Sequence, residues 1–274
     1  MLNSIKDNLK LLSALVIKEF KLKFRYKYKF ILSIINPSLG FIIPYLVFRK
    51  LFQALGDDSF GIWTPQNYVI FILTGIIVVL IINIISIYGK SFLQEKYWKT
   101  LSGIFMSPLN ISLFLIAKLV TELLVLGIPL VVVFIVCFII TQASFISILA
   151  ILGIFFCSCF FIASLGLAIG SFRISIEGNY TVLFTIIQFF LIFSCYKYPR
   201  DFFPWYLQFI ININPFYYYW DLMRNIFVFG FDFVLFNPNF LIHLIIILSF
   251  TTVFPILSIK FFNIVYRKYG ITGY

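Results

Sequence analysis

Long apolar runs separated by short polar segments dominate the pattern of this 274-residue chain. The runs lack the alternation of apolar and polar residues typical of strands, and each approaches the roughly 20 residues that cross a bilayer as a helix. Backbone groups in lipid must be hydrogen-bonded within the protein, so the spans are helices or a closed barrel, and the lack of alternation favours helices. We therefore predict an all-α integral membrane protein, a single transmembrane domain over residues 1–274, with six spans at about Phe30–Phe48, Asn67–Tyr88, Leu119–Ile140, Phe145–Phe172, Thr181–Tyr196 and Phe240–Phe262.

The segment before the first span, Met1–Lys29, has the pattern of a basic amphipathic helix. Its apolar residues recur at steps of three and four, and lysines occupy much of the remaining surface. Such a helix can lie in the membrane interface, either beside a cytosolic partner or as a surface anchor with no further role. The apolar positions are Ile5, Leu9, Leu12, Val16 and Phe20.

The first span is expected to end at Arg49 and Lys50, where two adjacent charges interrupt the apolar run. Gly56, Asp57 and Pro65 follow within a short distance, and these residue types favour a loop. The sequence therefore predicts an irregular connection over residues 51–66.

A polar segment, Gln94–Pro108, interrupts the chain between the second and third spans. Its charges cannot remain in hydrocarbon, so the segment must emerge on one face of the membrane. Tyr97, Leu101 and Phe105 lie at helical spacing, and Ser107-Pro108 follows as a stop. The pattern indicates a short surface helix. Docking to a soluble partner and an ordinary charged loop remain equally compatible with this spacing.

Composition and charge set the class and the orientation. Hydrophobic residues make up 62% of the chain and charged residues 11%, against about 25% charged in a soluble domain. Placing the N-terminus, residues 90–122, residues 173–180 and the tail 263–274 on one side, with Lys260 at the adjoining end of the last span, puts 16 of the 21 basic and 5 of the 10 acidic residues there. That side is the cytoplasm by the positive-inside rule, so both termini are predicted to be cytosolic in a multi-pass cell-membrane protein. Membrane lipids are its expected surroundings, and nucleic-acid binding is excluded because no basic soluble surface is available.

The stretch Lys197–Asn239, predicted to lie on the outer side, is too long for a tight turn and too apolar for a free loop. Two short helices are expected, at about 204–211 and 216–229, with prolines at their starts. Abundant Trp and Tyr suit an interfacial environment, so we expect re-entrant helices that dip into the outer leaflet. Asp221 and Arg224, three residues apart, are expected to pair. The segment is interpreted either as a lid that anchors the last two spans or as a gate for substrate.

Residues that could carry chemistry are scarce. The chain has no G-x-x-x-x-G-K-[ST] loop, one histidine (His243) and no clustered acids beyond Asp57-Asp58. We therefore predict no catalytic residue, no metal site and no cofactor in this chain. Two rival classes remain. An integral-membrane lipid-modifying enzyme would need clustered acids or a nucleophile with a base, and a secondary transporter would need charged residues near the membrane midplane.

Two segments resemble one family. Glu95, Thr100, Leu101, Ser107 and Pro108 are similar to the cytosolic coupling segment of type-2 ATP-binding-cassette (ABC) exporter permeases, although Lys99 and Ser102 depart from its usual Gly and Glu. The outer segment resembles the same family's stretch before the last span through Pro199, Pro204, Trp205, Asn214, Pro215, Asp221 and Arg224.

The resemblance implies a dimer, either a homodimer or a pair of similar permeases, bound to two cytosolic ATPase subunits that hold ATP and Mg²⁺. The cargo would be a glycan, a lipid-linked glycan, a lipid, a peptide or a drug. Tyr97 and Trp98 form an aromatic pair in the coupling segment, and Trp98 is then the natural anchor, because truncation of a buried Trp commonly weakens an interface.

Overall fold

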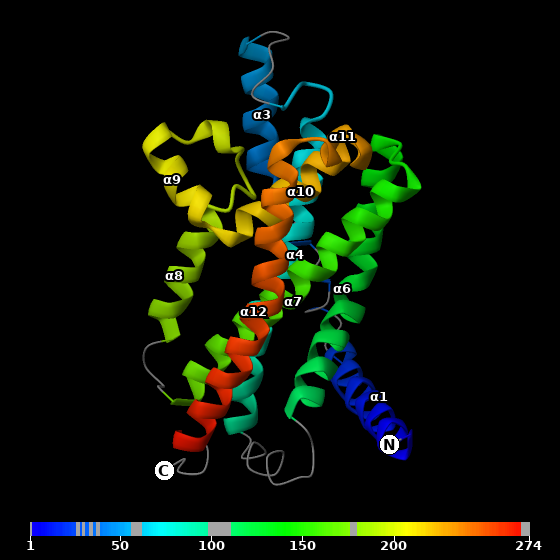
Figure 1. Ribbon diagram of the computed structural model, residues 1–274, viewed down its shortest axis with the longest axis vertical. Coiled ribbons are helices and arrows are strands. Elements are labelled where there is room, and N and C mark those ends of the chain that lie inside the picture. Colours follow the sequence, from blue (N-terminus) through cyan, green and yellow to red (C-terminus); the bar gives the residue numbers. More distant parts are fainter. Residues whose placement is uncertain are drawn as a thin grey trace.

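All regular structure in the described residues is helical (Figure 1). The computed structural model describes residues 2–25, 28, 31–32, 35–36, 39–55, 62–97, 111–175 and 180–269. Within these ranges, four helices are long and apolar enough to cross a membrane. They are α4 (Tyr68–Tyr97), α6 (Ile111–Thr141), α7 (Phe145–Ser175) and α12 (Pro238–Tyr269).

Helix α7 is the centre of this bundle, packing along both α4 and α12. Helix α6 also packs against α4, and the N-terminal helix α1 (Leu2–Phe24) packs against α6. The buried core is almost wholly aliphatic and aromatic, and one cluster includes Ile77, Ile81 and Ile84 of α4 and Phe161 of α7. The bundle therefore buries one side of each helix within the protein and leaves large apolar side chains exposed on the other.

The predicted spans agree with the structure in four places and differ in two. The first predicted span lies partly outside the described residues, and its described helix, α3 (Ile42–Leu55), continues past Arg49 and Lys50. The expected loop from residue 51 is therefore wrong for residues 51–55, which are helical. Phe48 and Phe52, one turn apart, explain the continuation because both are buried in one aromatic cluster.

The fifth predicted span, Thr181–Tyr196, is also shorter than expected. Helix α8 (Tyr180–Ile192) ends four residues early, and turns follow it. Its 13 residues extend about 20 Å, less than the roughly 30 Å of a hydrocarbon core. The apolar composition predicted the helix, whereas its end depends on the turn at Cys195 and Tyr196, whose backbone oxygens bind Arg224.

The outer segment forms a cap of short elements above the bundle (Figure 1). The expected helices are present as α9 (Trp205–Ile213) and α10 (Pro215–Phe229), preceded by the 3-10 helix η1 (Arg200–Phe202) and followed by α11 (Phe231–Leu235). Helix α10 packs against α7, α12, α4 and α6. It is therefore the element that joins the cap to the spans.

The cap and the N-terminal helix lie at opposite ends of the molecule (Figure 1). The free end of α1 and the C-terminal end of α12 share the lower end, where α4 also ends and α6 begins. This arrangement agrees with the expected placement of both termini on one side.

Candidate functional site: the cap and the coupling segment

The predicted coupling segment lies mostly outside the described residues. Glu95 and Tyr97 belong to the last turn of α4, so they continue the second span rather than begin a separate helix. The remaining candidates, Trp98, Thr100, Leu101, Ser107 and Pro108, all fall between residues 98 and 110, outside the described ranges. The last residue of α4 and the first residue of α6, between which these candidates fall in the sequence, lie at the same end of the molecule as α1 (Figure 1).

Prolines begin the short elements of the cap as the sequence predicts. Pro199 and Pro204 precede the first residues of η1 and α9 as their N-cap residues, and Pro215 is the first residue of α10. A missing N–H costs nothing at such positions, because the first N–H groups of a helix have no partner within the helix.

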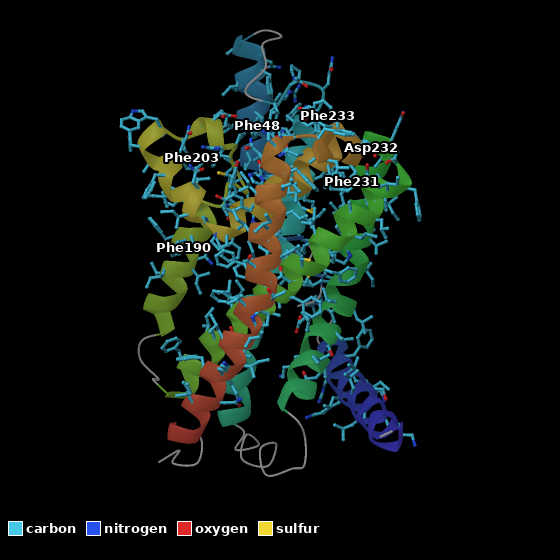
Figure 2. All side chains as sticks on the ribbon, in the orientation of Figure 1. Phe48, Phe190, Phe203, Phe231, Asp232 and Phe233 are labelled. Atoms are coloured by element: carbon cyan, nitrogen blue, oxygen red, sulfur yellow. The ribbon has the colours of Figure 1, made fainter. Side chains whose placement is uncertain are left out.

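Asn214 connects the start of α10 to α8. Its side-chain oxygen accepts a hydrogen bond from the backbone N–H of Phe216, 3.1 Å away, which caps α10. Its amide nitrogen donates to the backbone oxygen of Phe190 at 2.5 Å. Figure 2 shows Phe190 on α8, below Phe203 of the cap. One buried amide thus satisfies a backbone N–H of α10 and a backbone oxygen that lies 24 residues before Asn214 in the chain.

Arg224 is the central polar contact of the cap. Its Nε donates to Thr74 Oγ1 of α4 at 3.0 Å. The two terminal nitrogens donate to the backbone oxygens of Cys195 at 2.6 Å and Tyr196 at 2.9 Å. The guanidinium lies 3.7 Å from the centre of the Phe71 ring. A buried arginine needs such partners for its charge and its donors, and here it links α4, α10 and the turn after α8.

The Phe71 ring under Arg224 belongs to an aromatic cluster at the outer end of α3 and α4. Phe48 lies 5.4 Å from Phe71 between ring centres, and Trp63 lies 4.9 Å away in a T-shaped arrangement. Figure 2 shows Phe48 on α3 at this end of the molecule. Edge and tilted contacts of this kind add about 0.5–1.5 kcal/mol to area burial. The cluster therefore fixes the ring that supports the arginine.

Gly75 allows this close approach between α4 and the turn. A Cβ atom added there would overlap the Phe41 ring and lie 2.8 Å from the backbone oxygen of Tyr196, the same oxygen that Arg224 binds. Glycine is required here because any side chain would push the turn away from α4.

The expected ion pair between Asp221 and Arg224 is wrong. Asp221 instead faces α12, with its Oδ2 3.4 Å from Nδ1 of His243, and it accepts from Asn225 Nδ2 at 3.0 Å. Residues three apart share a helix face only approximately, so the two side chains turned to different neighbours. Arg224 donates to the backbone oxygens of Cys195 and Tyr196 in the turn after α8, and Asp221 lies beside His243 of α12.

Tyr219 completes the attachment of α10 to the spans. Its hydroxyl donates to the backbone oxygen of Ile247 at 3.0 Å and lies 2.7 Å from Thr251 Oγ1, both in α12. Its ring stacks on Phe161 of α7 at 5.3 Å between ring centres. Helix α10 is thereby held by polar contacts on α4, α8 and α12 and by ring contacts on α7.

Helix α9 presents a different surface. Trp205, its first residue, exposes 83% of its surface, and Tyr206, Phe209 and Ile213 are also exposed. An exposed aromatic face at the cap end of the molecule suits contact with lipid headgroups, where Trp and Tyr are enriched. The arrangement of α9 and α10 can close one end of the bundle. Within the described residues, no group of three or more His, Cys, Asp or Glu side chains could hold a metal ion.

Sequence reasoning missed the partners of Arg224. Thr74 lies inside an apolar run, and the other acceptors are backbone oxygens, which no side-chain pattern reveals. The one available signal was the charge itself, because an arginine beside membrane spans demands buried acceptors.

Comparison with known proteins adds one match. A family model described as ABC-2 type transporter matches residues 10–228, which include α1 from Lys10 onward, the bundle up to α8, and the cap to within one residue of the end of α10. No curated protein sequence matches the chain.

Proposed function

The chain belongs to the ABC-2 type transporter family, and on that premise we propose that it is the membrane subunit of an exporter. Two copies, or a pair of similar permeases, would form the path, and each would bind one cytosolic ATP-binding-cassette subunit. ATP and Mg²⁺ would be held by those subunits, because this chain has no phosphate-binding loop of the Walker type. The family match over most of the chain is the observation that carries this proposal.

In this proposal the chain has six spans in the cell membrane. The four described spans would be completed by the segments around α3 and α8. Both termini would lie in the cytosol, and the cap would lie outside. ATP-driven closure of the ATPases would push the segment between α4 and α6. The spans would then rearrange and release cargo beneath the cap. A glycan, a lipid-linked glycan, a lipid or a drug is the proposed cargo class.

The proposed orientation predicts the labelling of introduced cysteines. Cysteine at Lys96 or Lys268 should be protected from a membrane-impermeant thiol reagent in intact cells, whereas cysteine at the exposed Asp201 should react. The four natural cysteines are free and buried or half-buried, so they give little background. Labelling at position 96 in intact cells would reverse the orientation.

The coupling role predicts an uncoupled double variant. Trp98→Ala with Glu95→Ala should leave the permease in the membrane, weaken co-purification of the ATPase and abolish export while ATP hydrolysis persists. Truncation of an anchoring Trp commonly costs about 2 kcal/mol or more of binding, whereas a rim carboxylate costs less, so both changes are needed. Co-purification, membrane abundance and export are the measurements.

The matched control changes the same segment where it departs from the family pattern. Lys99→Ala with Ser102→Ala should keep ATPase binding and export. If the Glu95 and Trp98 variant exports and binds its partner as well as this control does, the segment is an ordinary polar loop and the coupling role is wrong.

A further inference from the structure

The apolar face of helix α1 packs against helix α6. Leu12, Leu15, Val16 and Phe20 are all half-buried, and α1 packs along the lower part of α6 (Figure 1). A membrane-surface helix is expected to turn that face into lipid. Because α6 occupies it, the surface of α1 left for other contacts is the opposite one.

An ion pair between helices sets the rotation of α1 about its own axis. Glu19 Oε1 lies 3.5 Å from Nζ of Lys118 in α6, and both side chains are largely buried. Glu19 is the one acidic side chain among those that the structure describes on α1, from Lys10 to Lys21. Its charge is therefore matched inside the contact with α6 and does not reach the open surface.

The open surface is a basic stripe. Lys10, Lys18, Lys21 and Arg25 are all exposed, and at 100° per residue they fall within one quarter of the helix circumference. Two apolar side chains, Leu11 and Ile17, lie at the edges of the stripe, and Ile17 exposes 54% of its surface. Positive charge flanked by exposed apolar residues matches a headgroup boundary, where both a negative charge and hydrocarbon are available.

The position of the stripe along α6 favours lipid over protein as its occupant. Lys118 lies near the start of α6 (Ile111–Thr141), directly before Leu119, where the sequence predicts that the third span begins. The ion pair therefore lies at the boundary of the hydrocarbon. Further along, α6 exposes the apolar side chains of Leu124, Ile128 and Val131, which offer a surface for acyl chains.

We propose that the basic stripe of α1 (Lys10, Lys18, Lys21 and Arg25) binds the headgroups of anionic phospholipids in the inner leaflet, with the Glu19–Lys118 pair holding the stripe toward them. The proposal rests on the orientation given under the proposed function, and on no other part of it. Anionic lipid would then tie α1 and α6 to the membrane surface.

The test uses the purified permease alone, in mixed micelles with phosphatidylglycerol or phosphatidylcholine. Thermal unfolding is followed as lipid is added, since a ligand that binds the folded state raises the transition temperature. We expect stabilisation by phosphatidylglycerol and little by phosphatidylcholine. Replacing three lysines (Lys10→Gln, Lys18→Gln, Lys21→Gln) should raise the half-effective phosphatidylglycerol concentration about 100-fold, because each basic residue near an anionic surface contributes roughly a five-fold factor.

Two control variants separate charge from folding. The same three positions changed to arginine should respond like the natural protein, and so should Arg49→Gln with Lys50→Gln, two exposed basic residues of α3 at the opposite end. An equal response to both lipids, or a full response by the glutamine variant, overturns the proposal. If the glutamine variant keeps its lipid response but no longer co-purifies with the ATPase in a separate experiment, the stripe binds an acidic protein surface instead. No ATPase or export enters the lipid assay, so its failure is distinct from failure of the proposed function.

Discussion

Arg224→Met is expected to remove most of the folded permease from the membrane. The change leaves the backbone oxygens of Cys195 and Tyr196 without their donors, and each unsatisfied buried polar group costs about 1–3 kcal/mol. The change also removes the contacts that hold the turn after α8. In that turn Cys195 has a positive φ of 59°, which L residues other than glycine rarely adopt. Together these losses predict destabilisation of about 2–5 kcal/mol.

Folded abundance and thermal unfolding in detergent are the measurements for Arg224. Arg224→Lys keeps the charge but cannot reach three acceptors with one ammonium group, so it should fall between the natural protein and the methionine variant. Arg49→Met, at an exposed position of α3, is the matched control and should behave like the natural protein. A methionine variant of natural stability would mean that the cap does not depend on this arginine.

Gly75→Ala is expected to be nearly as damaging, although it adds a single methyl group. The new Cβ would overlap the buried Phe41 ring and press on the Tyr196 carbonyl, which is backbone and cannot rotate away. Overpacking of this kind costs about 1–3 kcal/mol. Because the same carbonyl accepts from Arg224, we also expect the cap to loosen, measured as faster proteolysis of the segment around α9.

Two other glycines in spans provide the comparison for Gly75. Gly127 of α6 and Gly153 of α7 have no atom within 4 Å of an added Cβ. Alanine is the better helix former by about 1 kcal/mol, so Gly127→Ala and Gly153→Ala should be neutral or stabilising. Equal effects at all three positions would show that the contact at Gly75 is not tight.

The long spans were predictable because their signal is local. Each apolar run carries its own requirement for internal hydrogen bonds in lipid, so α4, α6, α7 and α12 followed from length and composition. The cap helices were predictable for a similar reason, since proline is favoured in the first turn of a helix and Pro204 and Pro215 each precede a short apolar run. The coupling segment could be recognised by resemblance, and its roles stay predictions because its residues from Trp98 onward lie outside the described ranges.

The contacts of the charged side chains were not predictable from spacing. Asp221 and Arg224 suggested a pair, but their choice of partner depended on which helices came alongside α10, and those were α12 and α4. The rotation of α1 is a similar case. Its amphipathic pattern showed an apolar face, and only the position of α6 decided that protein rather than lipid would cover it.

The sequence by itself determined the class of this protein, its helical spans, its helix starts and its charge asymmetry, because each of these arises from neighbours along the chain or from bulk transfer into lipid. Only the tertiary structure decided where α3 and α8 end, why Gly75 must be glycine, and what Arg224 binds. Those features depend on atoms that are distant in the sequence, such as the Tyr196 carbonyl brought against α4. A backbone oxygen has no residue type, so no pattern of side chains announces it before the chain has folded.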